Sequence, residues 1–312
     1  MARRRRKRSQ KNTFVILLVW TAIIVFIGSI VFWTPKIKIF LEEFTRPAVK
    51  EVDVSGLNSP YSIVITARGG RILGEQNGRE RMYPASMTKM MTAIVALDKL
   101  KLSKEITFTS EMLDALTGSD ATQAGYQPGE TAKVEDILYG IILPSGADCC
   151  MAVAYEIAGS EEAFVELMNR KAKKIGMKDT HFCNTTGLHD EDHYSTCYDM
   201  AILLKYCLRN KTFREIITSH YHSSGPTNIH PDGITVYSTM FNNLSSTEVT
   251  GGEILGGKTG FTNAAGLCLA SFAEIDGREY IVVTGGAPGT GEPLHVRDAV
   301  EVYNRIGNQL MS

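Results

Sequence analysis

The order of strand-like and helix-like segments limits the fold of this chain more than any other feature. Strand-like runs at residues 62–67 and 71–76 come first, and such runs return after about residue 234. Between them, over about 111–220, apolar residues recur with the 3.6-residue period of amphipathic helices, as they do again at 294–310. This order predicts an α+β fold, with an antiparallel sheet built from both ends of the domain, helices on its faces and a helical subdomain.

A long uncharged run near the N-terminus predicts one transmembrane helix before the folded domain. Residues 13–33 carry no charge, and residues 1–12 contain five Arg and two Lys. Twenty-one helical residues reach about 31 Å, the thickness of a bilayer core. The basic block predicts a cytoplasmic N-terminus, with residues 34–312 outside the cell membrane. An uncleaved single-pass anchor is favoured over a signal peptide, because the run is long and no A-x-A-like site follows it.

These features predict four segments. A basic cytoplasmic tail at 1–12 and a transmembrane anchor at 13–33 lead into a stalk at 34–56, and the folded domain covers 57–312. Without the tail the chain has 26 basic and 34 acidic residues. An acidic body argues against a nucleic-acid partner, because nucleic-acid-binding proteins gather basic residues on one face.

The six cysteines show no metal or redox spacing. No C-x-x-C occurs, and no known zinc pattern fits. Disulfides remain possible outside the membrane. Buried thiols are favoured, because most of these cysteines lie among Ala, Leu and Met. The cysteines are Cys149, Cys150, Cys183, Cys197, Cys207 and Cys268.

A Ser-x-x-Lys motif, Ser86 to Lys89, begins a predicted helix. The spacing puts the serine hydroxyl and the lysine amine on one helical face. A serine is a weak nucleophile until a base takes its proton, and a desolvated neutral lysine can be that base. The N–H groups at a helix start would stabilise an oxyanion. Taken alone, the motif also fits a capping serine and a solvated lysine.

Two further motifs follow. Ser145 lies between two predicted helices, where its hydroxyl could pass a proton to a leaving amine. Alone it reads as an N-cap. Lys258, Thr259, Gly260 and Phe261 directly precede a predicted strand. The ammonium and hydroxyl could bind a carboxylate, and glycine would allow close approach to the strand. Alone this motif reads as a turn.

In this order the three motifs match the set found in penicillin-binding proteins and class A β-lactamases. From Tyr61 to Val283 the chain resembles the low-molecular-mass penicillin-binding proteins, specifically serine D-Ala-D-Ala carboxypeptidases of the DacA type in peptidase family S11. The resemblance is carried by YPASMTKMMTAIVALD, LPSGADCCMAVA, FVELMNRKAKKIGM, NTTGLHDEDHYSTCYDMA and GGKTGFTNAAGLCLA. It implies the serine β-lactamase/penicillin-binding-protein fold.

The resemblance also implies a role for each motif residue. Ser86 would be the acylated nucleophile, Lys89 its base and Ser145 a proton relay. Lys258 and Thr259 would hold the substrate's terminal carboxylate, and the N–H groups of Ser86 and Phe261 would form the oxyanion hole. The implied substrates are peptidoglycan stem peptides ending in D-Ala-D-Ala, and β-lactams would be covalent inhibitors. No cofactor or metal is expected.

The chain departs from the family pattern at two points. The third position of the middle motif, usually Asn, is Ala147, so substrate binding or the position of Lys89 could change. Family members also often carry a C-terminal β domain and a C-terminal amphipathic anchor, for which we see no sequence here. The N-terminal span is expected to replace that anchor.

Three alternatives stay open. A class A β-lactamase would need a carboxylate that activates water, and Glu166 is the nearest candidate, although its helix predicts a surface position. A zinc peptidase could use His189 and His193, but their segment reads as a loop. A catalytically impaired scaffold protein is favoured only by Ala147. His220, His222 and His230 read as loop histidines.

Overall fold

The computed structural model describes Thr21, residues 49–289 and residues 291–311. The chain divides into two units, Met1–Ala48 and Val49–Ser312, and the second holds nearly all of the described residues. The predicted tail, the predicted span at 13–33 except Thr21, and the stalk up to residue 48 lie outside the described residues. No helix within the described residues has both the length and the apolar composition needed to cross a bilayer.

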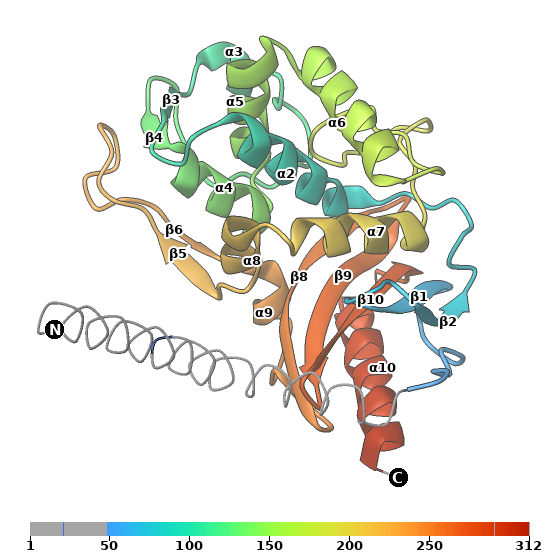
Figure 1. Ribbon diagram of the computed structural model, residues 1–312. Helices are drawn as coiled ribbons and strands as arrows, with labels where there is room; N and C mark the ends of the chain where they lie inside the picture. Colours follow the sequence, from blue (N-terminus) through green and yellow to red (C-terminus); the bar gives the residue numbers. More distant parts are fainter. Residues whose placement is uncertain (1–20, 22–48, 290, 312) are drawn as a thin grey trace, which may run out of the picture. The chain divides into compact units, whose positions relative to one another are not determined.

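A six-stranded antiparallel sheet forms the middle of the second unit, in the order β2-β1-β10-β9-β8-β7 (Figure 1). Strands from both ends of the unit meet at its centre, where β1 pairs with β10 from Tyr61↔Gly285 to Thr66↔Tyr280. The predicted antiparallel sheet is therefore confirmed. Its strands are β1 (Tyr61–Thr66), β2 (Ile72–Gln76), β7 (Glu248–Val249), β8 (Gly252–Thr262), β9 (Gly266–Ile275) and β10 (Arg278–Ala287).

Both faces of the sheet are buried, because alternate residues point to opposite sides. In β1, Ile63 and Ile65 belong to one hydrophobic cluster and Val64 to another. The cluster around Val64 is closed by α10 (Leu294–Met311), which packs on β9 and β10. Residues 49–54, predicted as part of the stalk, contribute three buried valines to this same cluster.

The opposite face of the sheet carries α7, which packs on β1, β9 and β10 and separates the sheet from the helical subdomain (Figure 1). Within that subdomain α5 is central and packs on α2, α3, α4 and α6. The helices are η1 (Ala85–Thr88), α2 (Lys89–Lys99), α3 (Ser110–Asp114), α4 (Val134–Ile142), α5 (Ala147–Ala158), α6 (Glu161–Ile175), α7 (Cys197–Cys207), α8 (Lys211–Ile217) and α9 (Thr239–Asn242).

Two small antiparallel pairs complete the described fold: β3 (Glu105–Thr107) with β4 (Thr131–Lys133), and β5 (Tyr221–Ser223) with β6 (Thr235–Tyr237). His222 therefore lies on a strand and not in the predicted loop, because β5 pairs with β6 and the ring stacks on Tyr139. All six cysteines are free, and all but Cys183 are buried, as predicted.

Candidate active site

The tight turn before α2 brings Ser86 and Lys89 together. Lys89 Nζ lies 3.1 Å from Ser86 Oγ and also donates to the carbonyl oxygen of Thr186 at 2.7 Å. Ser86 is in the 3-10 turn η1, and the α-helix starts only at Lys89. The predicted helix start at Ser86 is thus corrected to a tighter turn, because Ala85 before it has a left-handed φ of 46°.

Burial sets the charge of the two lysines in the motifs. Lys89 is 2% exposed and Lys258 is 1% exposed. Loss of water lowers the pKa of Lys89, and it lowers the pKa of Lys258 further, with the nearby Lys89 charge adding to the effect. Neither forms a salt bridge within the described part of the chain. Burial thus favours the neutral amine, which is the form in which a lysine can accept a proton from a serine.

The segment after α6, at residues 184–187, packs against the turn that carries Ser86 and Lys89. Asn184 Oδ1 accepts hydrogen bonds from the N–H groups of Thr186 and Gly187 and so fixes the carbonyl that binds Lys89. Gly187 has a φ of +83°, and a Cβ there would lie 1.9 Å from the Ala85 carbonyl oxygen. Only glycine allows this contact. The sequence predicted this segment as a loop, which is confirmed, but not its contact with Lys89.

His193 is a buried structural group beneath the motif. The Cys183 N–H donates to its Nδ1 at 3.2 Å, so Nε2 carries the proton and lies 2.9 Å from Thr88 Oγ1. His189 instead packs edge-on against Tyr83. The two histidines do not converge on one point, and no metal-binding group of three or more side chains lies within the described residues.

Acid should destabilise the protein through His193. Burial lowers the pKa of His193 to about 4. Between about pH 6.5 and pH 4, the histidine is therefore protonated in the unfolded chain but neutral in the folded protein. The free energy of unfolding should therefore fall as the pH is lowered from about 6.5 toward 4, and His193 should account for up to about 3 kcal/mol of that loss. Urea titrations at several pH values should show a smaller loss in His193→Gln than in the wild type. The exposed His181→Gln control should match the wild type, and equal losses in all three proteins would contradict the account.

Ser145 occupies the loop between α4 and α5 in a strained backbone. Its φ is 71°, its side chain is buried, and its Oγ has no hydrogen-bond partner within the described residues. A buried hydroxyl without a partner costs free energy. Among the described residues, no hydrogen bond joins the hydroxyl groups of Ser145 and Ser86. The buried hydroxyl of Ser145 therefore keeps an unused hydrogen-bonding capacity.

Asp148, which the sequence placed only in a first helical turn, binds the backbone of a distant loop. Its fully buried carboxylate accepts backbone N–H groups from Ala124, Gly125 and Tyr126 at 2.8–3.2 Å, and from Cys149 at 3.0 Å. A buried charge persists only when donors surround it. This carboxylate therefore fixes the loop before β4 against the start of α5.

Ala147 leaves the contact between Ser86 and Lys89 in place. Its methyl group is buried, and its N–H donates to the Thr122 carbonyl oxygen at 2.8 Å. Lys89 keeps its contacts with Ser86 and Thr186. The change that the sequence allowed for Lys89 is thus absent, whereas the missing amide leaves one hydrogen-bonding group fewer in the site.

The third motif lies inside a strand and not before one. Lys258 to Phe261 form the end of β8, which turns at 263–265 into β9. A Cβ on Gly260 would lie 2.9 Å from the Ser86 backbone nitrogen, so β8 runs directly beside Ser86. Thr259 Oγ1 is 2.7 Å from Thr239 Oγ1, a partner that the sequence did not indicate. Lys258 Nζ donates to the Thr259 carbonyl oxygen at 2.9 Å.

Glu166 has a surface position, as its helix predicted. It forms an ion pair with Arg170 on α6, and its side chain is 72% exposed. A water-activating carboxylate must lie within hydrogen-bond reach of the acyl group. Its contacts give Glu166 no link to Ser86 or Lys89.

Comparisons with known proteins agree with this geometry. The family described as D-alanyl-D-alanine carboxypeptidase, peptidase S11, matches residues 48–289. The D-alanyl-D-alanine carboxypeptidase DacF of Bacillus subtilis is 38% identical over 72% of this chain, and DacA of Escherichia coli is 35% identical over 53%. A solved mutant of the Streptomyces K15 DD-transpeptidase superposes with a TM-score of 0.72 and 25% identity, covering 80% of this chain and 97% of that one.

The chain spans only part of the length of these curated relatives. The matched region covers 57% of the Bacillus protein and 41% of the Escherichia protein. By contrast, it covers almost all of the Streptomyces structure.

Proposed function

Because the chain belongs to the peptidase S11 family of D-alanyl-D-alanine carboxypeptidases, we propose that it removes the last D-alanine from peptides ending in D-Ala-D-Ala. The observation that carries this proposal is the 3.1 Å contact between Ser86 Oγ and the Nζ of Lys89, which is buried and forms no ion pair with another described residue. A serine beside an amine that can lose its proton is an activated nucleophile. Hydrolysis through an acyl-enzyme follows from that pair.

Acylation would use groups from three segments, which are the η1–α2 turn, the loop before α5 and strand β8. Lys89 takes the Ser86 proton as Oγ attacks the carbonyl of the penultimate D-alanine. The N–H groups of Ser86 and Phe261 receive the oxyanion, since β8 passes beside the Ser86 nitrogen. Ser145 then passes a proton to the amine of the departing D-alanine, a task that suits its unpaired hydroxyl.

The third motif would select a free C-terminus. Lys258 Nζ and Thr259 Oγ1 offer N–H and O–H donors at the end of β8, and a bound carboxylate would favour the charged form of Lys258, whose pKa burial lowers. Thr239 fixes the Thr259 hydroxyl at 2.7 Å. After D-alanine leaves, water hydrolyses the Ser86 ester and restores the enzyme.

The proposal includes where this reaction takes place. We infer an N-terminal anchor at 13–33, with the catalytic domain on the outer side of the cell membrane, because seven basic residues precede an uncharged run of bilayer length. The substrates are then the pentapeptide stems of cell-wall peptidoglycan, which lie on that side.

Covalent labelling by a β-lactam tests the nucleophile. The purified full-length chain should gain the mass of one benzylpenicillin molecule, located by peptide mapping on Ser86, and Ser86→Ala should gain none. Ser110→Ala, which alters an exposed serine at another helix start, should label like the wild type. An adduct that persists in Ser86→Ala would contradict the assignment.

A further inference from the structure

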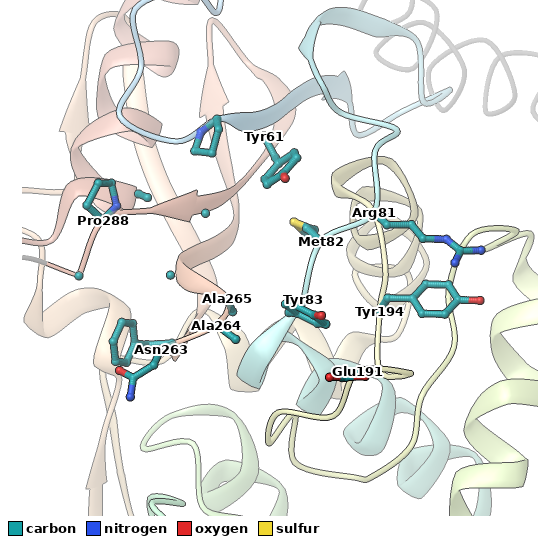
Figure 2. A pocket seen from close by; sticks show the side chains of 16 residues that line it. Tyr61, Arg81, Met82, Tyr83, Glu191, Tyr194, Asn263, Ala264, Ala265 and Pro288 are labelled. Atoms are coloured by element: carbon teal, nitrogen blue, oxygen red, sulfur yellow. The ribbon is translucent and has the colours of Figure 1, made fainter.

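The two faces of the sheet differ at the start of β1. On one face a pocket of about 670 Å³ opens between Tyr61, Tyr83, Tyr194 and Phe261 (Figure 2). The opposite face is covered by α10, which packs on β9 and β10. Ser62 follows Tyr61 in β1, and neighbouring residues of a strand point to opposite faces. The side chain of Ser62 therefore points toward α10 and away from the pocket.

Ser62 and Thr284 form a buried polar pair on the face that α10 covers. They are directly opposite each other across β1 and β10, and the next pair on this face, Val64 and Val282, belongs to the cluster that α10 closes. The Cβ atoms of such partners are about 5 Å apart. Both residues are at most 1% exposed, yet neither hydroxyl has a hydrogen-bond partner among the described residues. Two hydroxyls therefore lie side by side without bonding to each other.

A third polar atom of this kind comes from the first turn of α10. His295 is 3% exposed, and its Nδ1 has no hydrogen-bond partner in the part of the chain that the structure describes. Asp298 accepts hydrogen bonds from the N–H and the hydroxyl of Ser59, three residues before Ser62. Positions 295 and 298 lie on the same side of the helix. His295 is therefore directed toward the start of β1, close to Ser62.

The charges around these three groups favour a neutral ligand. Burial lowers the pKa of His295 to about 4, so its ring is neutral at neutral pH. The Asp298 carboxylate already accepts four hydrogen bonds, two from Asn58 and two from Ser59. An ion would find no free opposite charge here, and a buried ion without such a charge is costly. Two hydroxyls and a ring nitrogen instead suit a small molecule that both donates and accepts hydrogen bonds.

We propose that Ser62, Thr284 and His295 bind one buried water molecule between α10 and the sheet. A buried water typically makes about three hydrogen bonds to groups that would otherwise be unpaired. Because water can donate two and accept two, it pairs with both hydroxyls and with Nδ1 in either tautomer of the ring. Ser62 leaves room for it, since the valines next along the two strands are larger. The water thereby joins α10 to the strands that form one wall of the pocket.

A high-resolution crystal structure of the full-length chain tests the site directly. It should show one water peak about 2.7–3.2 Å from Ser62 Oγ, Thr284 Oγ1 and His295 Nδ1. Ser62→Val should lose the peak, because the added methyl groups fill the space and the hydroxyl is gone. Ser223→Val, at an exposed position of β5, is the matched control and should keep it. Hydroxyls bonded to each other or to backbone carbonyls, with no peak between them and His295, would overturn the proposal.

The sign of a change in Tm gives an independent test. Thr284→Val replaces the hydroxyl by a methyl group of similar size. If the hydroxyl binds the water, the variant should lower the Tm by about 2–4 °C, the effect of losing one hydrogen bond in a domain of this size. If the hydroxyl had no partner, the same change would raise the Tm, because a buried unpaired hydroxyl is costly.

A double variant shows whether the two hydroxyls share one ligand. Ser62→Ala should also lower the Tm, and the combined variant with Thr284→Val should lose clearly less than the sum of the single losses, because either change already weakens the water. A higher Tm in Thr284→Val, or losses that add fully, would contradict a shared water. Neither measurement depends on D-alanine release, so both test the site separately from the proposed function.

Discussion

Replacing Lys89 by methionine should slow acylation of Ser86 by about a thousandfold, within the range attributed to a positioned general base. Methionine keeps the length of the side chain and its apolar burial but removes the amine that lies 3.1 Å from Ser86 Oγ. The variant should remain folded, since methionine carries no charge that must be buried. Stopped-flow labelling with a fluorescent penicillin measures the rate directly.

The pH dependence of the same rate should identify Lys89 as the base. Burial lowers its pKa, so acylation by the wild type should rise with pH and level off below the ordinary pKa of a lysine. Lys89→Met should lose this rise. Acylation within tenfold of the wild type, with the same pH profile, would show that another group takes the proton.

A second buried lysine supplies the matched comparison. Lys171, on α6, is 9% exposed and donates to Asp98 and Tyr206, not to any residue of the three motifs. Lys171→Met leaves Asp98 without its partner, so it should lower the free energy of unfolding. Acylation should be unchanged. Lys89→Met should therefore change the acylation rate and not the stability, whereas Lys171→Met should change the stability and not the acylation rate.

Replacing Asp148 by alanine should lower the free energy of unfolding by about 3–5 kcal/mol, the usual result of removing one side of a buried charged network. Four backbone N–H groups lose their acceptor, three of them in the loop at 124–126. Urea denaturation measures the loss. Asp148→Asn should restore only part of the lost stability. One carboxylate oxygen, which accepts backbone N–H groups, would be replaced by an NH₂ group that cannot accept them.

The exposed Asp114→Ala, on α3 of the same subdomain, is the control and should change stability by less than about 0.5 kcal/mol. A loss in Asp148→Ala below about 1 kcal/mol would mean that water replaces the carboxylate. The loop before β4 would then not be held as described.

Local patterns were enough to predict most of the fold. Helices such as Glu161–Ile175 have a strong apolar period, and the caps of that helix, Ser160 and Gly176, are residue types typical of helix starts and ends. The β9–β10 turn was also predictable, because Asp276 and Gly277 both have the positive φ that this hairpin requires. These features depend on neighbouring residues, so a sequence shows them.

Other features depend on contacts between distant segments. Strand β8 (Gly252–Thr262) was not predicted, because glycines interrupt its apolar pattern. The close approach of η1, α8 and β9 explains those glycines only in three dimensions. The support of Lys89 by Thr186 and the bond between Thr88 and His193 join residues about 100 positions apart. No spacing rule predicts such pairs.

The pocket beside Phe261 illustrates the same limit. Its walls come from residues near 60, 82, 191, 264 and 287, which only the fold brings together. Ala147 is the reverse case, a departure visible in the sequence whose structural effect is small. The catalytic pair keeps its geometry without the usual amide.

Release of D-alanine from acetyl-D-Ala-D-Ala tests the central claim most directly. The purified full-length chain is assayed beside Ser86→Ala, with free D-alanine measured by an oxidase-coupled reaction. The account predicts release by the wild type and none above background by the variant. A folded wild-type protein that labels with benzylpenicillin but releases no D-alanine would contradict the carboxypeptidase assignment, and would favour a penicillin-binding protein impaired at Ala147.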